Sequence, residues 1–210
     1  TLFRSGWRIL CVNPPQTNTK TILKSMRYYS PAKLKQIKRH LHNGGVIAYP
    51  TESCYGFGCD PFNYSAINKI IQLKGRNKAK GMIVIAGSVA QLQKVIKPLN
   101  ANDKSQLTQY WPGFYSVILP VSRQTPRNLI GAHRKIAVRV TRHKLVKQLT
   151  NSLNMPLVST SANKSGHQSI KTYRECVRQF GKRVMVLSGA TNFAKKPSTI
   201  IDWESKKVLR

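Results

Sequence analysis

Apolar residues follow helical spacing in several parts of this chain. Leu34, Ile37 and Leu41 recur every three or four residues, which predicts an amphipathic helix. Ser30 followed by Pro31 is typical of a helix start, because serine caps the first turn and proline is tolerated in it. The same spacing predicts further helices near residues 66–74, 88–96, 103–111, 145–153 and 172–180.

Short apolar runs between these helices predict strands. They cover residues 46–49, 82–86, 116–121, 136–140, 157–160, 184–187 and 199–203. Residues 50–63 are rich in turn formers and residues 122–135 are basic, so both are expected to be loops. Helices and strands mix throughout without a repeat. This order predicts a single α/β domain whose sheet need not be wholly parallel.

The charge balance narrows the choice of partners. The chain has 36 Lys and Arg against six Asp and Glu, a net charge of +30, which attracts polyanions such as nucleic acids and nucleotides or an acidic membrane surface. A generic basic surface explains part of this excess. With so few carboxylates and no close pair, a two-carboxylate glycosidase or a carboxylate-rich metal site is improbable.

Other classes lack their signatures. No apolar run approaches the roughly 20 residues of a membrane span, and no signal peptide is visible. The four cysteines have no metal-binding spacing, so we expect free thiols in a reducing cytoplasm and no membrane association. We expect residues 1–29 to be an N-terminal extension and residues 30–210 to form the catalytic domain.

Familiar nucleotide and hydrolase motifs are missing. The sequence has no P-loop and no G-x-S-x-G elbow, and the G-x-G that begins at Gly56 fails as a dinucleotide fingerprint because its sixth position is Pro61. The five histidines match no metal spacing, so no metal-ligating residues are predicted.

Four polar clusters lie beside predicted strands. The stretch YPTESCYGFGCD, residues 49–60, combines the rare acid Glu52 with hydroxyls and glycines. Lys74-Gly-Arg76, followed by Lys80, offers cations for phosphate, although such runs are often only solvated. The other two are STSANKSG at 159–166 and PSTIID at 197–202, whose hydroxyls and amide suit an anion or an amino acid but also suit an ordinary turn.

Arg139 lies in the otherwise apolar run IAVRV. A buried arginine is costly unless it is paired or reaches a ligand, although the side chain could simply lie on a wet sheet face.

Together these segments resemble the YrdC-like family. YPTESCYGFG is similar to its YPTET-x-YGLG signature, KGR to its K-x-R segment, and STSANKSG to its S-x-SAN-x-SG. WPGFYS, IAVRVT, KPSTIID and the final Leu-Arg also match, in the family's order, over about residues 30–210. Since the sequence shows nothing after Arg210 that could be an extra domain, we expect the chain to be most similar to the short bacterial TsaC type.

The resemblance implies a fold and an activity. The family's fold is a twisted, mixed parallel and antiparallel sheet flanked by helices, with a basic concave face. Its members are threonylcarbamoyl-AMP synthases, nucleotidyltransferases that use L-threonine, bicarbonate or CO₂, and ATP, and that release pyrophosphate. The product serves threonylcarbamoyladenosine modification of tRNA through a downstream transferase complex. Mg²⁺ would be held mainly by the phosphates.

The resemblance also implies residue roles. Catalytic roles fall to Lys74, Arg76 and Arg139. Threonine would contact Thr51, Ser53, Tyr55, Ser161 and Ser198. The nucleotide would contact Lys74, Arg76, Lys80, Ser116, Asn163 and Arg210.

The sequence allows alternatives for the role of Glu52 and for the function of the protein. Glu52 could receive the threonine ammonium or a backbone N–H. The alternative function is a non-catalytic protein that binds tRNA or double-stranded RNA through its basic surface, with salt-sensitive affinity.

Overall fold

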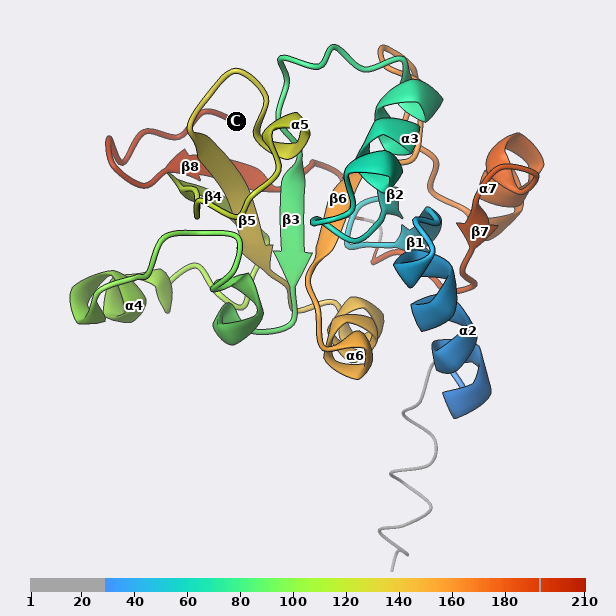
Figure 1. Cartoon of the computed structure of the whole chain (residues 1–210), viewed down its shortest axis with the longest axis horizontal. Helices are drawn as coiled ribbons and strands as arrows, with labels where there is room; N and C mark the ends of the chain where they lie inside the picture. The colour runs from blue at the N-terminus through green and yellow to red at the C-terminus, as the bar shows by residue number, and fades with distance from the viewer. Residues whose placement is uncertain (1–28, 193) are drawn as a thin grey trace, which may run out of the picture.

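The computed structural model describes residues 29–192 and 194–210, which form one mixed sheet with helices packed against it (Figure 1). The eight strands lie in the order β7-β1-β2-β6-β3-β5-β4-β8. Three neighbouring pairs are parallel (β1–β7, β3–β5 and β4–β8), and the others are antiparallel. The strands are β1 (Ile47–Pro50), β2 (Tyr55–Gly58), β3 (Ile83–Ala86), β4 (Tyr115–Pro120), β5 (Lys135–Val140), β6 (Leu157–Ser161), β7 (Met185–Val186) and β8 (Thr199–Asp202).

Most of the predicted helices are present, but the one predicted near residues 88–96 is only a short 3₁₀ turn. The one predicted near residues 103–111 lies earlier, at Ala101–Leu107, because Asn100 caps it. Ser30 caps the first helix, since its side chain accepts a hydrogen bond from the Lys33 N–H, and Pro31 occupies the first turn. The helices are α2 (Pro31–His42), α3 (Tyr64–Lys74), α4 (Ala101–Leu107), α5 (Arg127–Ile130), α6 (Lys144–Leu153) and α7 (Tyr173–Phe180), with a 3₁₀ turn at Val89–Leu92. Figure 1 shows α2, α3 and α7 towards one end of the sheet and β8 with the C-terminus at the other.

Successive strand residues face opposite sides of the sheet, and the two sides carry separate cores. Val84 packs in a cluster with residues of α3, α4 and α7. The next residue, Ile85, packs in a second cluster with residues of α2 and α6. Among the described residues, this second cluster includes strand residues of β1, β3 and β6 but none of β4, β5 or β8, so α2 and α6 leave that side of the last three strands uncovered.

The predicted α/β architecture is confirmed, but two predicted loops contain regular structure. Residues 50–63 include β2, which pairs with β1 and β6 although its YGFG sequence shows no apolar alternation. Gly58 is required by packing there, because a Cβ on it would lie 2.5 Å from the Tyr49 ring. The basic segment 122–135 includes the short helix α5, which the apolar spacing did not indicate.

Most of the expected N-terminal extension, residues 1–28, lies outside the described residues. Tyr29, at the expected boundary, is buried, and its hydroxyl donates to the Ser188 carbonyl at 2.8 Å. None of the helices described here is both long and apolar enough to span a lipid bilayer.

The core on the α6 side predicts a large stability loss on truncation. Leu149 is fully buried between α6 and the sheet. Leu149→Ala is therefore expected to lower the free energy of unfolding by about 2–5 kcal/mol. Chemical denaturation measures this loss, and Lys147→Ala on the exposed face of the same helix is the matched control. Equal stabilities of the two variants would contradict the assignment of α6 to the core.

Candidate active site

The uncovered side of the sheet forms the floor of a cavity. Alternation along β5 directs Lys135, Ala137 and Arg139 to this side, while Ile136 and Val138 enter the core. Ile118 of β4 and Ile200 of β8 extend the same floor. The cavity has a volume of about 970 Å³. This is within the usual range for small-molecule sites.

Segments that are far apart in sequence meet in this cavity. The loop after β1 contributes Thr51 and Ser53, the end of β6 contributes Ser161, and the start of β8 is preceded by Ser198. Three arginines complete the set: Arg76, Arg139 and Arg210. Seven of the twelve predicted site residues therefore line one cavity.

Arg76 reaches the cavity because α3 ends sharply. Gly75 adopts φ +57°, the left-handed conformation that favours glycine at the end of a helix. The Arg76 guanidinium donates to the carbonyls of Lys80 at 3.2 Å and Gly81 at 2.6 Å. These bonds fix the side chain while it lines the cavity. Burial lowers the pKa of Arg76.

Arg210 is brought to the cavity by the fold-back of the C-terminal residues onto β8. The Ile200 N–H donates to the Arg210 carbonyl at 3.0 Å, and the Leu209 N–H donates to the Ile200 carbonyl at 2.8 Å. The Arg210 side chain donates to the Ser198 carbonyl through Nε at 3.3 Å and Nη2 at 3.2 Å. Burial, and then the positive charge of Arg139, lower the pKa of Arg210. The two cations therefore act on each other across the cavity.

Arg139 is held by a buried ion pair. Its Nη2 donates to Oε2 of Glu52 at 3.0 Å, and the exposed fractions of the two side chains are 6% and 9%. The guanidinium also lies over the Phe114 ring, 5.3 Å from its centroid. Thr141 donates to the other oxygen of Glu52 at 2.6 Å. This pairing gives Glu52 a partner that the sequence did not indicate.

Hydroxyl groups form the neutral part of the cavity. Thr51 closes the loop after β1 by donating to the Cys54 carbonyl at 2.7 Å, and Ser53 stands beside it. The Ser198 hydroxyl lies 2.9 Å from that of Ser116, which is fully buried and does not itself line the cavity. Ser116 is thus placed to orient Ser198.

Lys74 does not line the cavity in this structure. Its buried ammonium donates to the Ser161 carbonyl at 2.5 Å, to the Asn163 carbonyl at 3.0 Å and to Asn163 Oδ1 at 3.1 Å. Asn163 in turn donates to the carbonyls of Lys164 at 3.0 Å and His167 at 2.5 Å. Burial, reinforced by the charge of Arg76, lowers the pKa of Lys74 to about 8. Lys74 and Asn163 therefore hold the loop after β6 in shape.

The remaining two predicted residues also lie outside the cavity lining. Tyr55 is fully buried on β2, and its hydroxyl donates to the Gly189 carbonyl at 2.6 Å. Burial raises the pKa of Tyr55 to about 12. The Lys80 side chain is exposed. The residue contacts the site through its backbone carbonyl, which accepts a hydrogen bond from Arg76.

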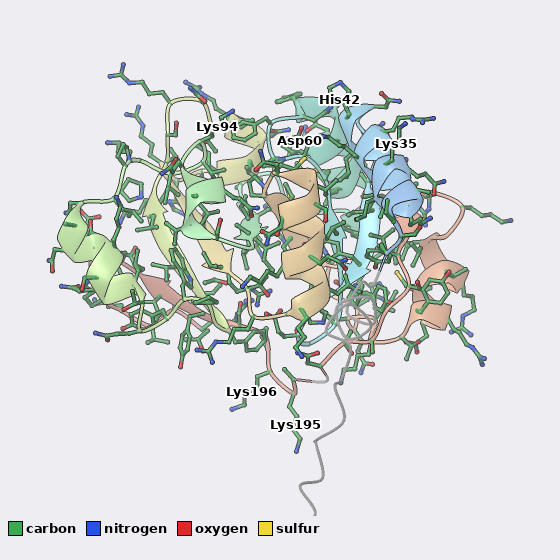
Figure 2. The ribbon with its side chains drawn as sticks, turned by 90° about the horizontal axis from the view of Figure 1, so that it is seen from below. Lys35, His42, Asp60, Lys94, Lys195 and Lys196 are labelled. Atoms are coloured by element: carbon green, nitrogen blue, oxygen red, sulfur yellow. The ribbon has the colours of Figure 1, made fainter. Side chains whose placement is uncertain are left out.

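The cavity also contains basic residues that the motifs did not identify. They come mainly from the segment before β5 and from the loop before β8, and they are His133, Arg134, Lys135, Lys171, Lys195 and Lys196. Figure 2 shows the side chains of Lys195 and Lys196 extending away from the body of the domain. For His133, Arg134 and Lys135, the only indication in the sequence was the basic composition of residues 122–135. The sequence did not indicate a site role for the other three.

This geometry suits a multiply charged anion bound beside a small polar molecule. Guanidinium groups bind phosphate or carboxylate oxygens, and the hydroxyls can bind the polar groups of a neutral or zwitterionic partner. Within the described part of the chain, no three His, Cys, Asp or Glu side chains gather as metal ligands. Of the carboxylates near the cavity, Asp202 pairs with Lys135 at 3.3 Å and Glu52 pairs with Arg139.

Sequence comparisons identify the family of the chain. Residues 39–210 match the Sua5/YciO/YrdC family model, which is described as "Telomere recombination". A threonylcarbamoyl-AMP synthase of Chromobacterium violaceum is 48% identical over 176 residues, covering 84% of this chain and 91% of the relative. The synthase of the same name from Methylobacillus flagellatus is 47% identical over 178 residues, covering 85% of this chain and 99% of the relative.

Solved structures give the same fold. P. abyssi Sua5, in a crystal structure with L-threonine, superposes with a TM-score of 0.78 at 26% identity, covering 86% of this chain and 54% of that longer protein. E. coli YciO superposes with a TM-score of 0.75, covering 86% of this chain and 89% of that one, and at 24% identity it supports the fold alone. The resemblance drawn from the motifs is confirmed: the chain belongs to the Sua5/YciO/YrdC family.

Proposed function

We propose that this protein is a threonylcarbamoyl-AMP synthase, which forms L-threonylcarbamoyladenylate and pyrophosphate from L-threonine, bicarbonate or CO₂, and ATP. The observation that carries the proposal is the meeting of Arg76, Arg139 and Arg210 with four hydroxyl side chains in one cavity. The names of the relatives, which are nearly full-length matches, support the same activity.

The reaction needs positioning more than it needs a protein nucleophile. The neutral amine of threonine adds to the carbon of CO₂. A C–N bond forms as one C=O π bond opens, and loss of the amine proton to solvent leaves a carbamate anion. The carbamate oxygen then attacks the α-phosphorus of ATP, the bond to the bridging oxygen breaks, and pyrophosphate leaves. Holding two anions together in line, and stabilising the charge that develops, is the task of fixed cations.

The cavity suggests a division of roles. Thr51, Ser53, Ser161 and Ser198 would hold threonine through their hydroxyls, with Tyr55 packed behind them. Arg76, Arg139 and Arg210 would bind the carbamate and the phosphates.

Three other predicted residues would act indirectly. Lys74 and Asn163 would shape the loop that carries Ser161, and Ser116 would orient Ser198. Lys80, which lies outside the cavity lining, would contribute only the longer-range attraction of its positive charge.

Mg²⁺ is expected to accompany the ATP phosphates. Both carboxylates near the cavity are engaged by basic side chains, so the described residues offer no free carboxylate set for a metal ion. The ion would neutralise phosphate charge while keeping waters as most of its ligands.

The product would pass to a downstream threonylcarbamoyl transferase complex that modifies tRNA, and the protein would work in the cytoplasm. The +30 charge also favours contact with tRNA or double-stranded RNA. A purely RNA-binding role leaves the buried hydroxyl and arginine cavity without a purpose.

The first prediction concerns the reaction itself. Protein incubated with ATP, bicarbonate and Mg²⁺ should release pyrophosphate only when L-threonine is present, because the carbamate is the attacking group. An enzyme-coupled pyrophosphate assay measures this, with L-alanine as the control amino acid. Absence of threonine-dependent release, with salt-sensitive RNA binding intact, would favour the RNA-binding alternative.

A second prediction concerns the cavity residues. Arg76→Ala and Ser161→Ala should each lower pyrophosphate release by about 100-fold, the usual cost of losing a donor that stabilises developing charge. Circular dichroism should show an unchanged fold. Arg174→Ala, on the exposed part of α7, is the matched control and should keep its rate. Near-normal rates in both cavity variants would mean that the substrates bind elsewhere.

A third prediction concerns Lys74. Its pKa of about 8 lies below the ordinary value of 10.5, so the unfolded chain binds more protons than the folded chain between these pH values. Stability therefore gains a contribution that grows as the pH rises from about 8 towards 10.5. Lys74→Met should lack this contribution. Denaturation at pH 7.5 and pH 10 measures it: a wild type with the same pH dependence as the variant would contradict the buried, protonated Lys74.

A further inference from the structure

Glu52 is a buried acid whose two oxygens are already occupied. Oε2 accepts from Arg139 at 3.0 Å, and Oε1 accepts from Thr141 at 2.6 Å. It is one of six acids in the chain, and its side chain is only 9% exposed. Burying a carboxylate away from water is unfavourable unless well-placed partners compensate for the lost hydration. The contacts with Arg139 and Thr141 therefore fix the position of the Glu52 carboxylate.

The ion pair leaves one part of the Arg139 guanidinium unused. Nη2 faces Glu52, whereas Nε is buried and has no hydrogen-bond partner among the described residues. The side chain is 6% exposed and lines the cavity. A buried donor without a partner is unfavourable. An anion in the cavity that accepts a hydrogen bond from Nε would remove this penalty. Contact with the Phe114 ring further restricts the guanidinium plane.

The same ion pair affects the chemistry of the amine. Threonine attacks CO₂ as a neutral amine, and a free carboxylate beside it would stabilise the ammonium form instead. Glu52 is neutralised by Arg139, and the cavity carboxylate of Asp202 is paired with Lys135. The cations of the cavity then favour the neutral amine, because nearby positive charge disfavours an ammonium group.

We propose that Glu52 is a positioning residue that orients Arg139 towards the substrate anion, and that it does not receive the threonine ammonium. The proposal rests on the proposed function, since it takes carbamate and phosphate oxygens as the anions. The backbone carbonyl of Glu52 also accepts a hydrogen bond from the Ala194 N–H at 2.9 Å, and a side-chain substitution leaves this contact in place. Substitution at Glu52 therefore tests the side chain separately from the loop before β8.

The test is a double-mutant cycle on the full chain, with Glu52→Gln, Arg139→Met and their combination. Calorimetry gives the affinities for ATP and for L-threonine, and the pyrophosphate assay gives turnover. We expect Glu52→Gln to weaken ATP binding about tenfold when Arg139 is present and less than twofold when it is absent, because contacting residues that act as a unit are not additive. Threonine affinity should change less than twofold. Glu175→Gln on α7, the same change outside the cavity, should alter none of these values.

A second variant covers the case in which Glu52→Gln does not fold. Thr141→Val removes only one of the contacts that hold Glu52, so it should weaken ATP binding in the same direction and leave threonine affinity unchanged. A tenfold loss of threonine affinity in Glu52→Gln, with ATP binding intact, would overturn the proposal. Additive effects of Glu52 and Arg139 in an active enzyme would also overturn it. An inactive wild type that still shows the coupling in ATP affinity would instead overturn the proposed function alone.

Discussion

Positive charge gathered on an uncovered sheet face is the constraint on which the rest of this site depends. Arg76, Arg139 and Arg210 line one cavity; burial lowers the pKa of Arg76, and burial together with the positive charge of Arg139 lowers the pKa of Arg210. Few carboxylates are available to neutralise these arginines. Backbone carbonyls accept hydrogen bonds from Arg76 and Arg210, and the buried acid Glu52 pairs with Arg139. The same arrangement is complementary to a bound anion, since its arrival relieves the repulsion.

Two buried charged groups support this arrangement. Glu52 holds Arg139 through a buried ion pair, and Lys74 holds the loop of Ser161 and Asn163 through hydrogen bonds to their carbonyls. Neither group needs to touch a substrate to be essential. This explains why a chain so poor in acids places one of them, Glu52, in a nearly dry position. It also gives the signature loop after β1 a structural purpose besides its hydroxyls.

Much of the fold could be predicted from the sequence, because caps and apolar spacing act locally. Ser30 and Pro31 mark the start of a helix through their own conformational preferences. Strand β2 could not be predicted in this way, since its YGFG sequence owes its structure to pairing with β1 and β6. The short helix α5 likewise lacked a local apolar pattern.

The site shows the same division between local and distant information. Motifs identified the polar segments that converge, and seven of the predicted residues do line the cavity. Spacing could not show that Lys74 turns towards Asn163, or that Glu52 pairs with an arginine 87 residues away. Nor could it identify Lys171 or Lys195, which carry no motif and reach the cavity only through the fold. Contacts between distant segments decide these roles, and a single sequence does not report them.

A crystal structure with L-threonine and a non-hydrolysable ATP analogue tests the central claim most directly. We expect both ligands in the cavity over β4 and β5, with the phosphates against Arg76, Arg139 and Arg210 and the amino acid against the hydroxyls of Ser53 and Ser161. Binding of the two ligands at separate places, or phosphates seated away from these three arginines, would contradict this claim.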